Sequence, residues 1–441
     1  MKKFIAITAV LSLTLSACNK EYTNPSTTTP ELVVRDSDGL ITLCNGLQAR
    51  YTTGGFVSVL YNRVALGGLS TNELSILNVG NIEEFNISLG AGNANNANGV
   101  LRNLWTQANL VKANADLVLR NANNALVPGT RSGIVAYASI FRALALGDLA
   151  LFFEQAPLVT GENAPFVDRT TLLRSAVTQL EAAATQLAAN PASADFTARI
   201  APGIDLPNTL QALIARYSLE AGDYDKAIAA AGRVDLTRRS VFNFDDNTRN
   251  PLFETSFGNK NVFEPTNVSL GLPAALAPDP ADRRLPFYVR AAPTATQNRG
   301  TGFYTANSAP IPVYLPGEML LIRAEAYARK SDLPNAVTEL NRVLTKTPAT
   351  TTPPTTALVD PFGVGAALPP YAGPLTTDVV LLEIYRNRQI ELAFQGFRLS
   401  DSRRFGRPGP GTPAAERNRT FYPYPRVERE NNTATPADPS I

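Results

Sequence analysis

The 441-residue sequence contains no histidine. Histidine is the usual general base near neutral pH and a common ligand of zinc, so its absence excludes Ser-His-Asp and Cys-His catalysis and the usual zinc sites. No phosphate-binding glycine loop, G-x-S-x-G motif or C-x-x-C pair occurs either. We therefore expect no cofactor and no metal. A glycosidase with two carboxylates stays open, because its acids need not be close in sequence; Asp245, Asp246 and Glu254 are candidates that resemble ordinary surface acids.

Cysteine is scarce as well, and the two that occur have separate roles. Cys18 follows two lysines, an apolar segment and Leu-Ser-Ala, a pattern typical of bacterial lipoproteins, in which this cysteine becomes the acylated first residue. We predict a signal peptide at 1–17 and a lipidated, flexible tether at 18–31; the alternative is an ordinary signal peptide followed by a chance cysteine. Cys44 has no partner for an internal disulfide and is expected in the core.

The sequence also lacks an excess of basic over acidic residues, or of acidic over basic ones. Two of the 40 basic residues lie in the leader, which leaves 38 basic residues against 38 acidic ones. A balanced chain has no electrostatic reason to bind nucleic acid or an acidic membrane surface as its main ligand. We therefore expect no nucleic-acid partner, and membrane attachment through the lipid anchor alone.

What the sequence does contain is a repeated helical hairpin. The segment 316–346 shows apolar residues at helical spacing on both sides of a short turn, and 206–234 repeats this layout. Aligning Asp223 with Asp332 also brings Ala215 onto Ala324 and Ala227 onto Ala336. Two such segments, near 206–235 and 316–346, indicate tetratricopeptide-like hairpins that stack as a solenoid. The predicted fold is mainly all-α, as a single domain over 32–441.

The other elements follow from composition. The segment 131–153 is apolar on nearly every face, so we expect a central buried helix. The glycine pair at 67–68 is expected to interrupt a helix, and 86–99 is expected to be loop. The insert at 238–312 is irregular and aromatic-rich, with room for short strands. Rings on loops suit sugar faces and also suit peptides, although most rings fill cores. The ligand candidates are Tyr288, Phe303 and Tyr304.

The last strong helix carries a recognisable signature, EIYRNRQIELAFQGFRLSDSRRFG, over 383–406. It resembles the closing motif of the SusD/RagB-like nutrient-uptake lipoproteins, with Gln395 and Leu399 as departures. The matching charged residues are Arg388, Glu391, Arg398, Asp401 and Arg404. We interpret these five as a structural network that ties the last helix to the repeats. Arg388 and Glu391 lie three residues apart on one helix and are expected to pair.

The resemblance implies a non-enzymatic lipoprotein on the outer surface of the outer membrane. Proteins of this family capture glycans, or in some cases peptides, and pass them to a SusC-like TonB-dependent transporter. Two alternatives stay open at this point: a surface glycoside hydrolase, and a tetratricopeptide scaffold that binds only proteins.

Overall fold

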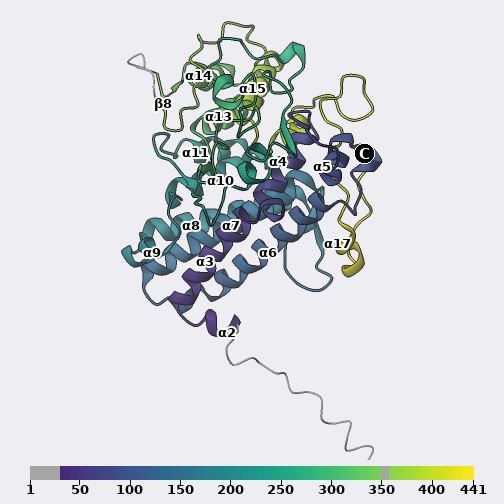
Figure 1. Cartoon of the computed structure of the whole chain (residues 1–441). Coiled ribbons are helices and arrows are strands. Elements are labelled where there is room, and N and C mark those ends of the chain that lie inside the picture. The colour runs from purple at the N-terminus through teal and green to yellow at the C-terminus, as the bar shows by residue number, and fades with distance from the viewer. Residues whose placement is uncertain (1–29, 349–356) are drawn as a thin grey trace, which may run out of the picture.

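Helices dominate the computed structural model, which describes residues 30–348 and 357–441 (Figure 1). The predicted mainly α-helical fold is confirmed. The predicted signal peptide, Cys18 and nearly all of the tether lie outside the described residues, and the assignment of 32–441 to one domain stays a prediction.

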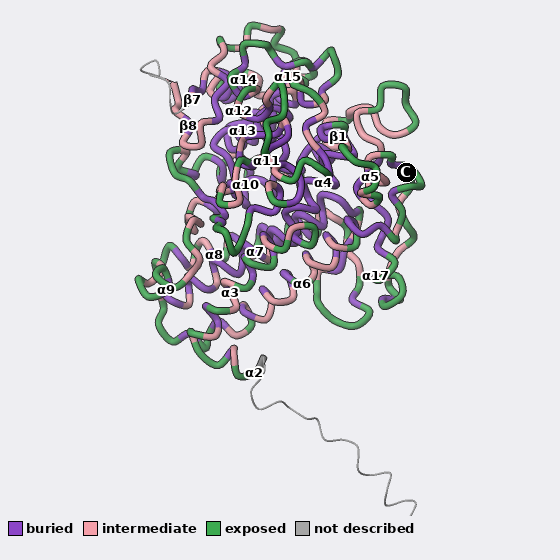
Figure 2. The backbone as a smooth tube through the Cα atoms, in the orientation of Figure 1, coloured by how far each residue is buried: buried purple, intermediate pink, exposed green. Residues whose placement is uncertain are grey.

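The N-terminal half is a bundle around one long helix. Its helices are α2 (Pro30–Val33), α3 (Ser37–Thr52), α4 (Val59–Leu69), α5 (Ile82–Leu89), α6 (Gly99–Asn121), α7 (Pro128–Phe152), α8 (Arg169–Ala189) and α9 (Ala194–Arg199). Helix α7 packs against α3, α6 and α8 and is buried along nearly its whole length, as predicted (Figure 2). Among the described helices only α7 is long and apolar enough to cross a membrane, and 89% of its most apolar window is buried inside the protein. It is therefore the core helix.

Both predicted hairpins are present. They comprise α10 (Leu206–Ala221) with α11 (Tyr224–Ala231), and α13 (Pro316–Arg329) with α14 (Leu333–Leu344). Gly222 ends α10 with a φ of 82°, and the equivalent turn after α13 contains Ser331 at φ 63°. The Asp332 carboxylate caps α14 by accepting a hydrogen bond from the Asn335 backbone N–H. Helix α11 packs on α13, and α13 packs on α15 (Thr377–Glu391), so the hairpins stack in a row.

The remaining elements are short. They are the helices α12 (Arg284–Tyr288), α16 (Arg398–Arg404) and α17 (Arg426–Asn431), the single turns η1 (Gly55–Val57), η2 (Ala91–Asn93), η3 (Ala122–Asn124) and η5 (Ala274–Leu276), and the π-helical turn η4 (Phe253–Phe257). Within 30–348 and 357–441 the strands form four two-stranded pairs: β1 (Leu74–Ile76) with β5 (Phe263–Pro265), β2 (Gln155–Pro157) with β3 (Phe166–Asp168), β4 (Val241–Phe242) with β6 (Ile311–Pro312), and β7 (Thr347–Pro348) with β8 (Val359–Asp360). Only the last pair is parallel.

Two local predictions were wrong. Helix α4 runs through Gly67 and Gly68 instead of stopping there. A Cβ at Gly67 would lie 2.6 Å from the Gly396 carbonyl oxygen, and one at Gly68 would lie 2.5 Å from the Leu74 side chain. The pair therefore allows close packing and does not break the helix. The loop expected at 86–99 begins later, because α5 continues to Leu89.

Candidate functional site

The charged residues of the C-terminal signature lie inside the protein. Arg388 binds both carboxylate oxygens of Asp401, at 3.0 Å each. Arg404 contacts Asp401, Glu325 at 2.8 Å, and Glu220 of the first hairpin. Arg388 does not pair with Glu391, contrary to the expectation from their spacing, because Asp401 of α16 occupies its guanidinium. These contacts join α15 and α16 to both hairpins.

Glu391 belongs to a second buried cluster. Its carboxylate accepts hydrogen bonds from Arg284, at 3.1 Å, and from Lys346. Each cation also has its own acid, with Arg284 2.7 Å from Asp282 and Lys346 2.6 Å from Asp360. Burial opposes the charge on Arg284, but these carboxylates outweigh it and raise its pKa. A cluster that is satisfied from within is structural, and a ligand cannot reach it.

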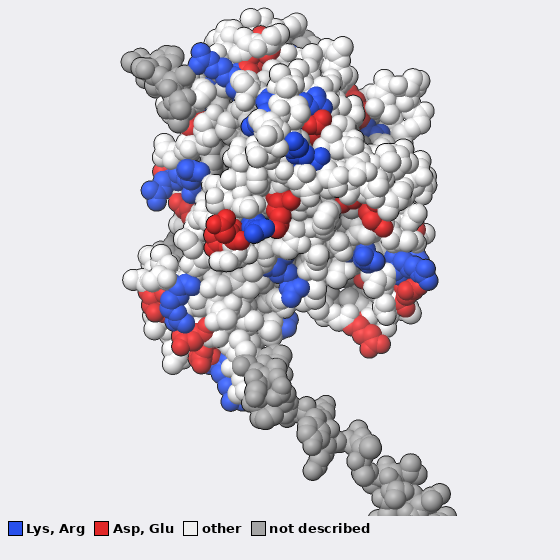
Figure 3. Space-filling view, in the orientation of Figure 1, with Lys and Arg blue, Asp and Glu red and all other residues white. Residues whose placement is uncertain are grey.

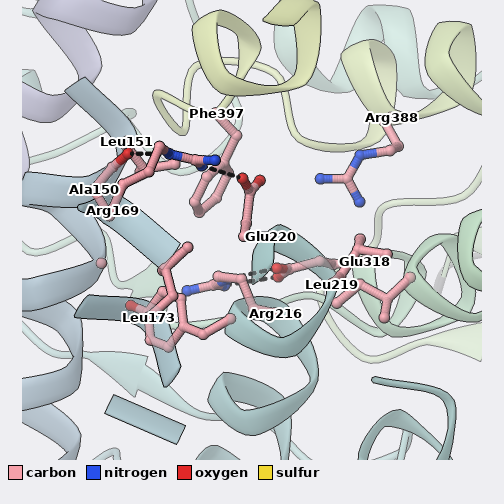
Figure 4. Close-up of a pocket in the computed structure, with 13 residues that line it drawn as sticks. Ala150, Leu151, Arg169, Leu173, Arg216, Leu219, Glu220, Glu318, Arg388 and Phe397 are labelled. Atoms are coloured by element: carbon pink, nitrogen blue, oxygen red, sulfur yellow. Dashed lines mark hydrogen bonds and ion pairs between the residues drawn. The ribbon is translucent and has the colours of Figure 1, made fainter. Parts of the chain in front are cut away.

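A small cavity lies between α7, α8, α10 and α13, beside the first of these clusters (Figure 4). Arg216 and Glu318 meet at its wall through two hydrogen bonds of 2.5 and 2.7 Å. Its volume is only about 10 Å³, which is the space of one water molecule. The cavity is therefore too small to be a nutrient site.

The three predicted ligand rings are buried as well. The Tyr288 hydroxyl donates to the Glu391 carbonyl and the Tyr304 hydroxyl to the Phe394 carbonyl, each at 2.7 Å. Phe303 packs edge-on against the rings of Tyr288, Tyr304 and two further phenylalanines. A ligand would reach these rings only if the surrounding loops moved, so their role in binding stays a prediction.

A different aromatic residue lies at the surface. Phe56 is 45% exposed, and it is the one exposed aromatic side chain among the described residues. It belongs to η1, on the rim of a hollow of about 730 Å³. The other lining residues are Thr53, Gly54, Gly55, Asp246, Asn247, Thr248, Arg249, Glu254, Thr255 and Asn259. We call this depression the Phe56 hollow; one ring among hydroxyl, amide and charged groups is a lining suited to a sugar.

A second depression of about 280 Å³ continues the Phe56 hollow, because the two share Thr53 and Thr248. Asn45, Gln48 and Asn243 add amide groups to its lining. Most of the polar residues that line the two depressions are uncharged.

Side-chain amides hold the walls of the Phe56 hollow in place. Asn62 and Asn103 both donate to the Phe56 carbonyl oxygen, at 2.8 and 3.2 Å. On the facing wall, Asn250 donates to the carbonyls of Phe303 and Ala309, at 2.9 Å each, while its own oxygen accepts from two backbone N–H groups at the start of η4. The ring and the polar wall opposite are thus positioned before a ligand arrives.

Asp245, Asp246 and Glu254, the acids considered for hydrolysis, all line these depressions. Asp245 and Glu254 are engaged in local hydrogen bonds or ion pairs. Asp245 accepts hydrogen bonds from the Thr248 and Asn247 backbone N–H groups and from the Thr248 hydroxyl, and these lower its pKa. Glu254 pairs with Arg249 at 3.3 Å. A glycosidase needs one carboxyl that stays protonated, which requires a raised pKa. Within the described residues no group of three potential metal ligands occurs.

Sequence reasoning did not single out Phe56. The available signal was an aromatic residue placed directly after the glycine pair Gly54-Gly55. Gly54 and Gly55 have φ of 97° and 54°, and a Cβ on Gly55 would lie 3.1 Å from the Thr255 hydroxyl. These glycines let the turn approach η4 closely and present the ring outward.

Comparison with known proteins shows a similar family model and similar folds over most of the chain. The profile of the SusD family matches residues 239–438. A SusD-like carbohydrate-binding protein of Bacteroides vulgatus aligns with a TM-score of 0.70 at 15% identity, covering 92% of this chain and 98% of that one. A SusD superfamily protein of Bacteroides fragilis gives 0.66 at 16%, covering 90% and 98%. At these identities the structures show the fold alone. No curated protein matches the chain.

Proposed function

Since this chain belongs to the SusD/RagB family, whose members are non-catalytic binding proteins, we propose that it captures oligosaccharides at the cell surface and passes them to a TonB-dependent outer-membrane transporter. The chain is accordingly a binding protein and not an enzyme. In this proposal the protein is attached through the acylated Cys18, which is followed by the short polar tether.

The observation that carries the proposal is the position of Phe56. Phe56 is the most exposed of the aromatic residues described, and it lines the larger of two joined polar hollows. Sugars present an apolar face to stack on a ring and hydroxyls that bond to amides and carboxylates. The carbohydrate-binding description of the similar Bacteroides vulgatus structure agrees with this ligand class.

The charges around the hollow favour a neutral glycan. Arg249 and Glu254 neutralise each other, and Asp246 adds one acid. Basic and acidic residues are interspersed over the face shown in Figure 3, with no broad area of one sign. An anionic sugar would meet no unpaired cluster of cations in this hollow.

We infer a transporter partner because a lipid-anchored binding protein needs a channel to deliver its ligand. A protein held by lipid captures a nutrient but does not carry it through the bilayer, so capture serves import only if a channel receives the ligand. The stacked hairpins provide an extended surface for such a partner, while the hollow is built from loops. We place the docking surface on the hairpins.

The glycan proposal is tested by replacing Phe56 with alanine. Loss of the stacked ring is expected to weaken oligosaccharide binding about tenfold, as measured by calorimetry on ligands found in a glycan array. Leu126→Ala is the matched control, because Leu126 is 82% exposed but lines none of the hollows described. Equal affinity of both variants for the same glycan would show that Phe56 does not bind it.

The partner proposal is tested separately. A tagged copy at native expression is purified from outer membranes in mild detergent, and a transporter barrel is expected in near-equal amount. A functional interface should bury at least about 1,000 Å². Repeated isolation of the lipoprotein alone in several detergents would contradict the partnership without affecting the glycan result.

A further inference from the structure

The turn between α6 and α7 carries the most exposed large apolar side chain of the described residues. Leu126 is 82% exposed, and Val127 beside it is 58% exposed. Leu32 of α2 is a third exposed apolar side chain, at 46%. Single exposed apolar side chains are common on proteins, whereas neighbouring groups of them mark interaction surfaces.

Leu32 and this turn lie at the same end of the helical bundle. The Asn124 side chain donates to the Val34 carbonyl at 2.7 Å, which joins the turn to the residue that follows α2. Both η3 and α2 also pack against α3. Figure 1 shows α2 at one end of the protein and α13, α14 and α15 at the other. We call the side chains of Leu32, Leu126 and Val127 the apolar tip.

The turn that carries the tip is held rigidly. Ala122 and Ala125 are buried beneath it. The Ala125 N–H donates to the Ala122 carbonyl at 3.1 Å, and the Arg131 guanidinium donates to the Ala125 carbonyl at 2.9 Å. The two apolar side chains that follow Ala125 therefore do not fold back onto the core. They stay in water unless something beyond the described residues covers them.

Three arginines lie on the segments that carry the tip. Arg35 follows α2, Arg120 is in the last turn of α6, and Arg131 is near the start of α7. None of them forms an ion pair with an acid in the part of the chain that the structure describes. Asp36, next to Arg35, is engaged in capping α3. Unpaired cations beside apolar side chains favour a lipid surface, whose phosphates are anionic.

The chain that precedes the described residues joins the protein beside the tip. Helix α2 begins at Pro30, and residues 18–29 lie between it and the lipidation site. These twelve residues span at most about 40 Å. A globular chain of this length has a radius of gyration of about 22 Å and is therefore about 55 Å across. A bilayer that holds acylated Cys18 is thus kept nearer to α2 than to the hairpins at the opposite end.

We propose that the apolar tip inserts into the interface of the bilayer that holds the lipid anchor, with the three arginines among the headgroups. The proposal rests on attachment through Cys18, proposed above, and adds which surface of the protein meets the membrane. Leucine and valine side chains leave water for the boundary of the acyl chains, while arginine keeps its charge among phosphates. Three side chains are too few to hold the protein, so attachment still depends on acylation.

A lipid surface fits the tip better than a folded partner does. A stable protein interface buries about 800 Å² on each side, and three side chains supply a small part of that area. Exposed Asn123 and Asn124 border the tip with amides, so the apolar area does not extend along the turn. A bilayer interface requires no shape complementarity and accepts a small apolar group. Because the tip and the hairpins lie at opposite ends, this contact belongs to the protein before it docks on the transporter.

The first test places a reporter on the tip of the acylated, full-length mature protein. Leu126→Trp and its control Leu375→Trp are reconstituted separately in vesicles of phosphatidylcholine and phosphatidylglycerol. Leu375 is 62% exposed and lies just before α15, far from the tip. Lipids brominated on their acyl chains quench an indole that enters the bilayer. Leu126→Trp emission is expected to shift to shorter wavelength and to be mostly quenched, and the control to change little. Trp105 is buried and adds a constant background.

Mass spectrometry of the same samples shows whether Cys18 is acylated, so failure of the anchor is distinguished from failure of the tip. Acylated protein in which the two reporters behave alike would overturn the proposal. A shift of Leu126→Trp that grows with protein concentration in the absence of vesicles would assign the tip to a second copy instead. A shift that requires the purified transporter would assign it to that partner.

A second pair of variants needs no acyl chain. In the Cys18→Ala protein, weak binding to an excess of the same vesicles is measured by sedimentation. Leu126→Asp should lower the partition coefficient about tenfold, because the tip loses an apolar side chain and gains a charge that the headgroups oppose. Leu375→Asp, also at an exposed position, should change it less than about twofold. Equal partition of these two variants would contradict insertion of the tip.

Discussion

Replacing Arg404 with alanine is expected to destabilise the protein by about 3–5 kcal/mol. The Arg404 side chain is only 11% exposed, and its guanidinium contacts Glu220, Glu325 and Asp401 together. Removing one partner of a buried ion cluster leaves the opposite charges uncompensated, which is the costly case. Without Arg404, Glu220 would keep Arg169 and Asp401 would keep Arg388, while Glu325 would keep Arg329 and a longer contact of 3.9 Å to Arg388.

The pKa of Glu220 gives a second measure of this cost. Burial alone would raise that pKa, but Arg404 and Arg169 outweigh burial and lower it from 4.5 to about 2. At 1.36 kcal/mol per pKa unit, the difference corresponds to about 3 kcal/mol of stabilisation from the ionised carboxylate. Because the folded-state pKa is the lower one, this stabilisation is complete above about pH 4.5 and is lost as the pH falls toward 2.

Urea unfolding at pH 7 and at pH 3, together with thermal melts, measures both effects. With an unfolding entropy of about 2.1 cal/mol/K per residue, a loss of 4 kcal/mol lowers Tm by about 4–5 °C for a chain of this length. Arg426→Ala is the control, since the Arg426–Glu430 pair is exposed and screened by solvent. If Arg404→Ala cost no more than this control at pH 7, or if its cost did not shrink at pH 3, the account of the cluster would be wrong.

Three further outcomes are expected. Gly147→Ala should lower the free energy of unfolding by about 2–4 kcal/mol, because the new Cβ would lie 2.3 Å from the Tyr217 ring. Gly46→Ala is the control and should be neutral or stabilising, because a Cβ there would have no atom within 4 Å. Urea unfolding of both variants measures the difference. Secretion behind an ordinary cleavable signal with Cys18→Ala should move the protein to the soluble fraction, and retention in membranes would mean that lipidation is not what holds it. Glycan affinity should change little between low and moderate salt, because a neutral ligand offers no charge to screen; a steep salt dependence in calorimetry would indicate a charged ligand.

The parts of the fold that the sequence predicts are those with local patterns. The hairpins were found because 206–234 repeats the layout of 316–346, and α7 because its apolar residues cover every face. The prediction at Gly67-Gly68 was wrong because these glycines are explained by a contact that is distant in sequence. Its reason lies in the Gly396 backbone, more than 300 residues away, and a local pattern does not contain that information.

The candidate site was not predictable in the same way. The chain holds 20 phenylalanines, 14 tyrosines and one tryptophan, and no local feature tells which of these rings the fold leaves exposed. The insert 238–312 contributes Asp246 and Glu254 to the lining of the proposed hollow, but the exposed ring comes from residue 56. Likewise, the partners of Glu391 include Arg284, which is 107 residues distant in sequence.

The buried signature network and the Phe56 hollow occupy separate parts of the protein, and they differ in how they use charge. The signature arginines are held inside by Glu220, Glu325 and Asp401, and so they fix how α15 and α16 sit on the hairpins. The hollow uses none of them; its walls are the turn at 54–56 and the loop 246–259, held by neutral amides. Because no ion pair of that interior network reaches the hollow, its lining can be substituted at little cost to the helices. Ligand preference in a scaffold of this kind should therefore be altered by changes in those two loops, while changes at the signature should alter stability.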